Sequence, residues 1–256
     1  DEVTGHGNDM HASQMTALAF DSVNPGETSQ YCYIAESAGV FKYHCSGVHL
    51  IGMDQHVFSG MYGIAIVDPA NGYKKLMVEK TSGSGDLDRQ FYDADALEFQ
   101  LQFNQLYLNE DGNYDAGAMF QHHNSATVVN GIQFGYVPNM LHNILLKGDA
   151  NKNIFVAQPW NGLELENMQS QLLYVENDQH VRLFIENHGN EPVYFHIVGE
   201  ILDRVTQGNR VQSGATETWL LGGSQNMIAD LVFDEPGAYA LVNHDYAAIY
   251  TGGIGL

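Results

Sequence analysis

Short apolar runs separated by turn residues recur along most of the chain. Each run has the length of one strand, and Gly, Asn, Asp and Pro stand between the runs. This texture is typical of all-β sandwiches or barrels. The strands that we expect are Tyr31–Ile34, Val40–Tyr43, Gly63–Val67, Leu97–Phe103, Ser170–Val175, Val181–Glu186 and Tyr239–Val242. Only Met140–Leu146 and Pro159–Met168 suggest a short helix or turn.

An internal repeat indicates two similar halves. The stretch GHGNDMHAS at residues 5–13 resembles NHGNEPVYFHIVG at 187–199, and SAGVFKYHC, ending at Cys45, resembles EPGAYALVNH, ending at His244. Two matches in the same order indicate duplicated β-sandwich domains. We predict a first domain over residues 1–81 and a second over 96–256. The acidic, Gly-rich stretch 82–95 lacks periodicity, which predicts a linker.

The first half is short for a complete sandwich. Only about 40 residues precede the strand that ends at Cys45, whereas such a domain needs roughly 100. We therefore expect the first domain to be incomplete at its N-terminus and the second to lack its last strand. The sequence then reads as a piece of a longer protein.

The charge balance is strongly acidic. Ten Lys and Arg stand against 31 Asp and Glu, which gives a formal charge of −21 over 256 residues. Such a surface repels phosphate backbones, so we expect no nucleic-acid partner. It fits an acidic, salt-tolerant or extracytoplasmic protein. No run approaches the roughly 18 apolar residues of a membrane-spanning helix, so we expect no transmembrane segment.

The densest candidate chemistry surrounds Cys45. His56 and Met61 follow it in the stretch DQHVFSGM, so three metal ligands can converge from one hairpin. Thiolate, imidazole and thioether groups select copper, and two His, one Cys and a weak axial Met describe a blue electron-transfer site. His6 is the candidate fourth ligand. A disulfide between Cys45 and Cys32 is the alternative, but Cys32 reads as a buried strand residue.

Several stretches resemble copper-containing nitrite reductases. VNPGETSQYCYIAESAGVFKYHC and HVFSGMYGIAIVDP are similar to the first domain of that family, and ETWLLGG and PGAYALVNH to its second. The resemblance implies two cupredoxin-like Greek-key β-sandwich domains. It also implies reduction of nitrite to nitric oxide, two coppers per subunit, a small redox protein as electron donor and an extracytoplasmic location.

The resemblance assigns roles to individual residues. Those matching the ligands of the type 1, blue copper are His6, Cys45, His56 and Met61. Those matching the ligands of the type 2, catalytic copper are His11, His44 and His244. In this family the adjacent subunit supplies the third type 2 ligand, here His244, so a homotrimer is implied. Asp9 and His196 match the acid–base pair above the catalytic copper.

The order of these residues makes chemical sense. His44 and Cys45 are neighbours on a strand, so their side chains point to opposite faces. Two coppers bound back to back would then lie on the order of 10 Å apart. A three-His site leaves a coordination position open for substrate. The reaction consumes two protons, which a carboxylate and an imidazole can deliver locally.

Some features depart from the family pattern. The step of eleven positions from Cys45 to His56 is longer than in the bacterial enzymes and contains His49. Ile201 stands where a second imidazole near His196 is expected. The remaining histidines lack partners at ligand spacing and are expected to be surface or structural residues: His122, His123, His142, His180 and His188.

Other functions explain less of the sequence. A two-domain, laccase-like multicopper oxidase needs His-X-His pairs for its trinuclear cluster, and the sequence contains none. A blue-copper electron-transfer protein would account for the four type 1 residues alone. It leaves His44 and His244 unexplained. A plain β-sandwich binding protein would leave the whole ligand set without a purpose.

Overall fold

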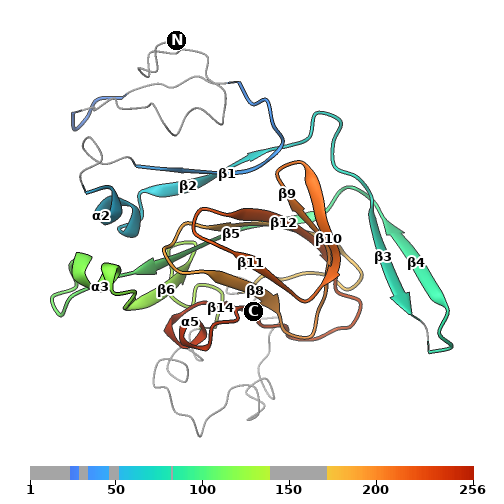
Figure 1. Ribbon diagram of the computed structural model, residues 1–256. Coiled ribbons are helices and arrows are strands. Elements are labelled where there is room, and N and C mark those ends of the chain that lie inside the picture. The colour runs from blue at the N-terminus through green and yellow to red at the C-terminus, as the bar shows by residue number, and fades with distance from the viewer. Residues whose placement is uncertain (1–23, 29–33, 46–51, 82, 139–171) are drawn as a thin grey trace, which may run out of the picture.

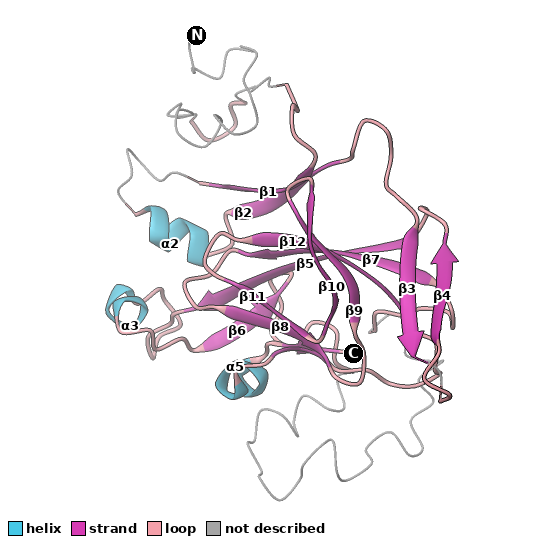
Figure 2. Ribbon diagram, turned by 45° about the vertical axis from the view of Figure 1, so that its right-hand side comes forward, coloured by secondary structure: helices cyan, strands magenta, loops and turns pink. Residues whose placement is uncertain are grey.

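The computed structural model describes residues 24–28, 34–45, 52–81, 83–138 and 172–256. Within this part the protein is built almost entirely of strands, with three short helices (Figure 1; Figure 2). The all-β class predicted from the sequence is confirmed. The helices are α2, α3 and α5, which span Met53–Phe58, Ala116–Phe120 and Tyr246–Thr251.

Two sheets packed face to face form the main body. The larger has six strands in the order β10-β9-β12-β7-β5-β6, which span Arg210–Thr216, Leu202–Gln207, Asn226–Val232, His180–Asn187, Leu97–Leu106 and Ala126–Val129. The smaller has four strands in the order β11-β8-β13-β14, which span Thr218–Leu221, Val193–Ile197, Leu241–Asn243 and Ile254–Gly255. Neighbouring strands are antiparallel except β5 and β7, which run parallel.

The main core lies between these two sheets. Alternate residues of the larger sheet point inward, so Leu101, Leu183 and Ala229 meet Phe195 and Ile197 of the smaller sheet. This is the period-2 alternation expected of strands with one face on a core. The central strand β7 nevertheless has no exposed residue, because its other face is covered as well.

A two-stranded hairpin covers that second face. It consists of β1 (Gly39–His44) and β2 (Tyr62–Val67), paired antiparallel from Gly39↔Val67 to His44↔Tyr62. In both views it lies along the larger sheet, opposite the smaller one (Figure 1; Figure 2). Its apolar contact is small and centres on Val40, Phe184 and Ile228. The described part therefore has three layers.

A second hairpin projects from the side of this body. It pairs β3 (Leu76–Thr81) with β4 (Leu87–Tyr92) (Figure 2). Strand β4 (Leu87–Tyr92) lies inside the stretch 82–95, so the predicted linker contains a strand. The cross-strand pairs Met77↔Phe91 and Glu79↔Arg89 explain this order, although the stretch shows no periodicity by itself. The predicted domain division at 82–95 remains a prediction.

Most other expected strands are confirmed. The runs beginning at Val40, Gly63, Leu97 and Val181 all lie in strands, with bounds extended by a few residues at most. The run Tyr239–Val242 overlaps β13 only at its end. The two helix expectations, at 140–146 and 159–168, and most of 31–34 lie outside the described residues.

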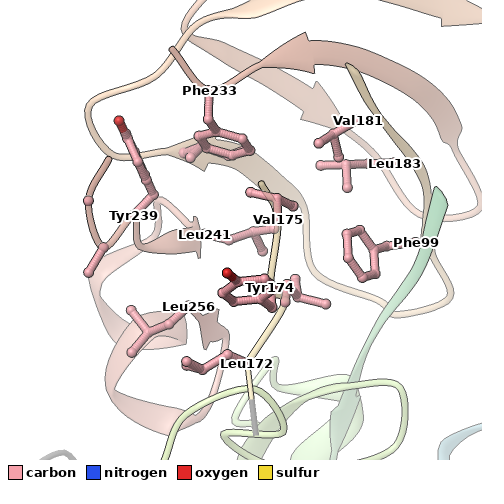
Figure 3. A pocket seen from close by; sticks show the side chains of 14 residues that line it. Phe99, Leu172, Tyr174, Val175, Val181, Leu183, Phe233, Tyr239, Leu241 and Leu256 are labelled. Atoms are coloured by element: carbon pink, nitrogen blue, oxygen red, sulfur yellow. The ribbon is translucent and has the colours of Figure 1, made fainter. Parts of the chain in front are cut away.

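The expected strand Ser170–Val175 is wrong where it can be compared. Residues 172–175 form no strand; their apolar side chains instead line a pocket of about 180 Å³ at one end of the core. Phe99, Phe233 and Leu256 complete its walls (Figure 3). Two of these side chains, Leu173 and Val175, are partly buried against the core, so a short apolar run does not fix the backbone conformation.

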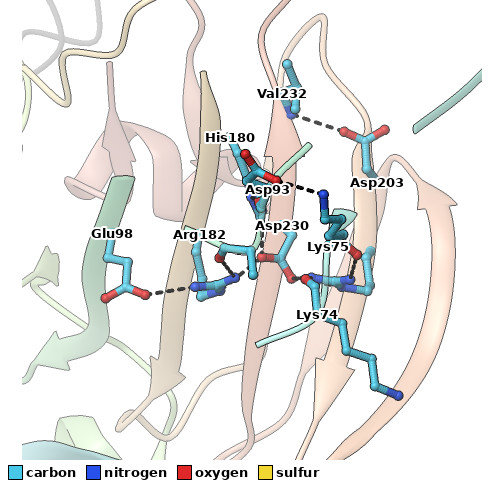
Figure 4. A network of polar contacts seen from close by, with 11 residues as sticks. Lys74, Lys75, Asp93, Glu98, His180, Arg182, Asp203, Asp230 and Val232 are labelled. Carbon is cyan, nitrogen blue, oxygen red and sulfur yellow. Dashed lines mark hydrogen bonds and ion pairs between the residues drawn. The ribbon is translucent and has the colours of Figure 1, made fainter. Parts of the chain in front are cut away.

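A buried ionic network joins the larger sheet to the base of the projecting hairpin (Figure 4). Asp230 accepts hydrogen bonds from His180 at 2.9 Å, Arg182 at 3.0 Å and Arg204 at 2.8 Å. Burial alone would raise the pKa of Asp230, but the hydrogen bond from His180 and the two arginine charges hold it below its usual value. The arginines also donate to backbone carbonyls in segments 74–75 and 93–95.

Candidate metal centre

The hairpin β1–β2 brings three predicted ligands together. Cys45 follows β1 directly, and its Sγ lies 3.2 Å from Nδ1 of His56. The Cys45 N–H donates to the Met61 carbonyl at 2.9 Å, and the Met61 N–H donates to the His56 carbonyl at 3.0 Å. Backbone hydrogen bonds therefore hold the thiolate, imidazole and thioether residues next to one another.

The connection between the two strands explains this convergence. Helix α2 carries His56 and begins after Gly52, whose φ of 75° is a left-handed value that favours glycine. The chain then reverses through Gly60, with φ of 102°, which brings Met61 back to the start of β2. Residues 46–51, with His49, lie outside the described part.

The donor set matches copper. A cysteine sulfur and an imidazole nitrogen at this separation can bind one metal ion with little movement. Cys45 is half-buried, and Met61 is 54% exposed beside it. Soft sulfur ligands with imidazole select copper over Mg²⁺ or Ca²⁺. The residues present therefore fit the metal that the sequence predicts.

His44 lies on the same strand, one residue before Cys45. Its Nδ1 lies 2.7 Å from the Cys45 carbonyl oxygen, so the ring donates this hydrogen bond. That interaction fixes the tautomer and leaves Nε2 as the nitrogen able to bind a metal. One peptide unit therefore joins two candidate metal ligands that face different ways.

A second group of candidate residues lies on the smaller sheet. His196 of β8 and His244, which follows β13, have ring centroids 5.1 Å apart. Nδ1 of His196 lies 2.8 Å from the Glu217 carbonyl oxygen and 3.1 Å from the Thr218 hydroxyl. A carbonyl can only accept, so His196 donates from Nδ1 and keeps Nε2 available to exchange a proton.

The chain is similar to copper enzymes over nearly its whole length. No family model matches it. It is 26% identical to the copper-containing nitrite reductase of Neisseria gonorrhoeae over 256 residues, which covers 98% of this chain and 53% of that protein. The chain thus spans about half the length of the curated relatives that it matches.

A solved structure gives the deciding likeness. The copper nitrite reductase from Nitrosomonas europaea superimposes with a TM-score of 0.64 and is 30% identical, covering 92% of this chain and 67% of that one. This chain belongs to the copper-containing nitrite reductase family. The predicted resemblance is confirmed, as is the cupredoxin-like fold class.

The fold extends to more distant members. The copper-containing nitrite reductase from Thermus scotoductus is 22% identical with a TM-score of 0.62, covering 91% of this chain and 44% of that chain. At that identity the likeness shows the shared fold alone. Among the residues that the structure describes, no helix is long and apolar enough to cross a membrane.

The structure reaches only part of the nitrite reductase ligand set. Cys45, His56 and Met61 are brought together, and His44 lies beside them. His6, Asp9 and His11 lie outside the described residues, so their assigned roles remain predictions. Within the described ranges of this one chain, no group of three or more His, Cys, Asp or Glu residues could hold a metal ion.

Exposed apolar side chains surround the His196–His244 group. Tyr194 and Leu220 form a cross-strand pair on β8 and β11, two residues along each strand from the pair His196↔Thr218 and so on the same face. Both are exposed, as is Tyr246, whose ring lies 5.5 Å from His244. Exposed apolar side chains therefore lie beside the candidate residues His196 and His244.

Sequence reasoning missed a buried pair of polar residues under the β1–β2 hairpin. Glu186 and His188 point toward β1–β2, and their side-chain oxygens and nitrogens are buried without a hydrogen-bond partner among the described residues. Burial raises the pKa of Glu186 to about 8, although the charge of Lys42 lowers it in part. Burial also lowers the pKa of His188 to about 3. The alternation of polar and apolar residues along β7 did not indicate that Glu186 is buried, because both faces of that strand are covered.

Proposed function

We propose that this protein reduces nitrite to nitric oxide by one electron, at a type 2 copper that receives electrons from a type 1 copper. The adjacency of His44 and Cys45 carries the proposal. The Cys45 Sγ lies 3.2 Å from Nδ1 of His56 within the proposed type 1 ligand set. The preceding residue, His44, belongs to the proposed type 2 ligand set. Such a connection suits a reservoir of single electrons joined to a reaction centre.

Two ligand sets would hold the metal ions. The type 1 set is His6, Cys45, His56 and Met61, and the type 2 set is His11, His44 and His244 of an adjacent subunit. Copper bound in these sets would supply one-electron transfer and a position open to nitrite. The protein backbone contributes preorganisation, because hydrogen bonds join Cys45 to Met61 and Met61 to His56.

Proton delivery falls to His196 and Asp9. Conversion of nitrite to nitric oxide and water takes one electron and two protons. His196 donates from Nδ1 to the Glu217 carbonyl, which orients the ring and leaves Nε2 to pass a proton onward. The carboxylate of Asp9 is the second proton donor of the proposal.

The partners follow from the same arrangement. The exposed apolar side chains around His244 support contact with another copy of this chain. We propose that three copies assemble as a homotrimer. A small redox protein would supply electrons at the type 1 copper. The chain's charge of −21 supports a positively charged donor. We place the protein outside the cytoplasm.

Subunit complementation tests the shared site. His44→Ala and His244→Ala proteins each lose nitrite reduction and the type 2 copper signal while keeping blue absorbance. In mixed trimers an intact His44 of one subunit can face an intact His244 of the next. Random assembly restores about a quarter of the interfaces.

Co-expression of the two variants should therefore recover about a quarter of the wild-type turnover. Each variant expressed with wild-type chains is the matched control for assembly. Nitrite reduction by the His244→Ala protein alone, or no recovery in trimers shown to be mixed, would contradict the proposal.

A further inference from the structure

Helix α2 depends on contacts from outside itself. It has six residues, and Gly52 at its N-cap provides no side-chain hydrogen bond. A helix of fewer than two turns is unstable alone, because forming the first turn costs more conformational entropy than its hydrogen bonds return. The position of His56 in this helix must therefore be set by tertiary contacts.

Those contacts come from the loop that follows β5. The Tyr114 hydroxyl donates to Oδ2 of Asp54 at 2.5 Å. The Phe58 ring packs edge-on against Tyr107, with centroids 4.9 Å apart, and lies nearly parallel to Tyr114 at 6.3 Å. These contacts, together with a longer hydrogen bond of 3.4 Å from Asn104 of β5 to the Val57 carbonyl, hold α2 against the sandwich.

The two tyrosines are themselves firmly held. Tyr107 is fully buried, and its hydroxyl donates to Glu191 at 2.9 Å. Tyr114 forms a β-bridge with Leu108, and the next residue, Asp115, donates its N–H to the Tyr107 carbonyl at 2.9 Å. The aromatic side chains that contact α2 are thus themselves held to the sandwich by hydrogen bonds and burial.

The spacing of residues on α2 determines which face of the helix contacts the sandwich and which face carries His56. Asp54 and Phe58 are four positions apart, so they lie on one face of the helix. His56 lies midway, about 200° around the axis from Asp54. Holding the first face against the sandwich therefore presents the imidazole on the opposite side, where its Nδ1 meets the Cys45 sulfur at 3.2 Å.

We propose that Tyr114 and Phe58 are positioning residues for the blue copper site: through them the sandwich fixes α2, and hence the His56 imidazole, relative to Cys45. The inference rests on the proposed function in that His56 and Cys45 bind copper. It adds that the packing of α2 on the sandwich, to which Tyr114 contributes from far along the chain, sets the geometry of the metal centre. Groups around a metal site orient its ligands and tune the metal.

Removing one hydroxyl tests this positioning. Tyr114→Phe keeps the ring and deletes only the donor to Asp54. In the copper-loaded, full-length protein, the variant should lose its blue copper to a chelator about tenfold faster than wild type, because a hydrogen bond to a charged group is lost. Its visible charge-transfer bands and its electron paramagnetic resonance parameters should shift as well.

The chain contains a matched control. The Tyr73 hydroxyl donates to Asp68 at 2.8 Å, at the opposite end of the same hairpin. Tyr73→Phe therefore removes the same kind of interaction from the same hairpin without touching α2. It should lose copper at the wild-type rate and leave both spectra unchanged. Phe58→Leu, which removes the ring contacts but keeps an apolar side chain, should behave like Tyr114→Phe.

The outcomes separate this inference from the function on which it rests. A wild-type protein that binds no blue copper would contradict the proposed function. A blue wild-type protein whose Tyr114→Phe and Phe58→Leu variants both match Tyr73→Phe in spectra and copper loss would overturn the positioning role. A lower unfolding temperature of the metal-free variants with unchanged spectra would assign these residues to folding alone and would likewise overturn it.

Discussion

The two faces of the six-stranded sheet differ sharply in what they bury. The inner face meets the smaller sheet through apolar residues such as Leu101, Phe103 and Leu183. The outer face, under the β1–β2 hairpin, buries Arg182, Glu186 and other polar groups around a small apolar cluster. Apolar burial is non-directional, whereas hydrogen bonds and ion pairs depend on geometry.

The difference teaches where the fold is stabilised and where the site is positioned. A dry core supplies free energy of folding but tolerates small displacements of one layer against another. A polar contact surface contributes less to the free energy of folding, but it permits fewer arrangements of the two layers. We infer that the inner face stabilises the body, while the outer face places the hairpin that carries Cys45 and His56.

The largest effect is expected from Asp230→Ala. The change leaves Arg182 and Arg204 buried without their shared carboxylate, which costs about 3–5 kcal/mol. Because the arginines also bind the carbonyls of segments 74–75 and 93–95, amide exchange should accelerate in those segments. Denaturant unfolding and hydrogen exchange measure the two effects.

Leu183→Ala is the control from the inner face. It should cost a comparable 2–5 kcal/mol, roughly, by leaving a cavity. Its exchange rates near residues 74–95 should change only as much as global stability does. Selective loosening of that segment in the Leu183 variant, or none in the Asp230 variant, would contradict the division between the two faces.

A smaller, pH-dependent effect is expected from Glu186→Gln. The folded pKa of Glu186 is raised to about 8, so the stability it contributes is full below pH 4.5 and is lost as the pH rises through 8. His188 has the opposite sign, since its folded pKa is about 3 and its contribution disappears as the pH falls below 6.5. Of these two residues, Glu186 is therefore the one whose contribution changes between pH 6.5 and 8.

The wild-type unfolding free energy should therefore fall by about 2 kcal/mol more than that of the variant between pH 6.5 and 8. Denaturant titrations of the metal-free proteins at these two pH values measure the difference. Glu98→Gln, on the same sheet face but partly exposed, is the matched control and should follow wild type. Parallel pH profiles for wild type and Glu186→Gln would show that Glu186 is not held in its neutral form.

The sequence predicted the parts of the molecule that depend on local pattern. Strand β2 and the strand leading to Cys45 follow from alternation and turn residues, and the order of Cys45, His56 and Met61 on one hairpin was sufficient to indicate copper. Strand β4 escaped notice because its outward side chains, such as Phe91, are ordered only by cross-strand partners.

The contacts that hold α2 against the sandwich could not be predicted in the same way. Asp54 and Tyr114 are sixty positions apart, and nothing in the spacing of either residue indicates the other. Glu186 likewise reads as the polar end of a strand until the hairpin is placed over it. Contacts between layers depend on tertiary structure, which periodicity along the chain does not record.

The most direct test of the account is the copper content of the full-length protein, measured together with visible absorption and electron paramagnetic resonance. We predict two coppers per subunit, one blue and one type 2, with Cys45→Ser losing the blue signal and keeping the other. A single blue copper would instead indicate an electron-transfer protein, four coppers would indicate an oxidase, and blue absorbance in Cys45→Ser would contradict the ligand assignment itself.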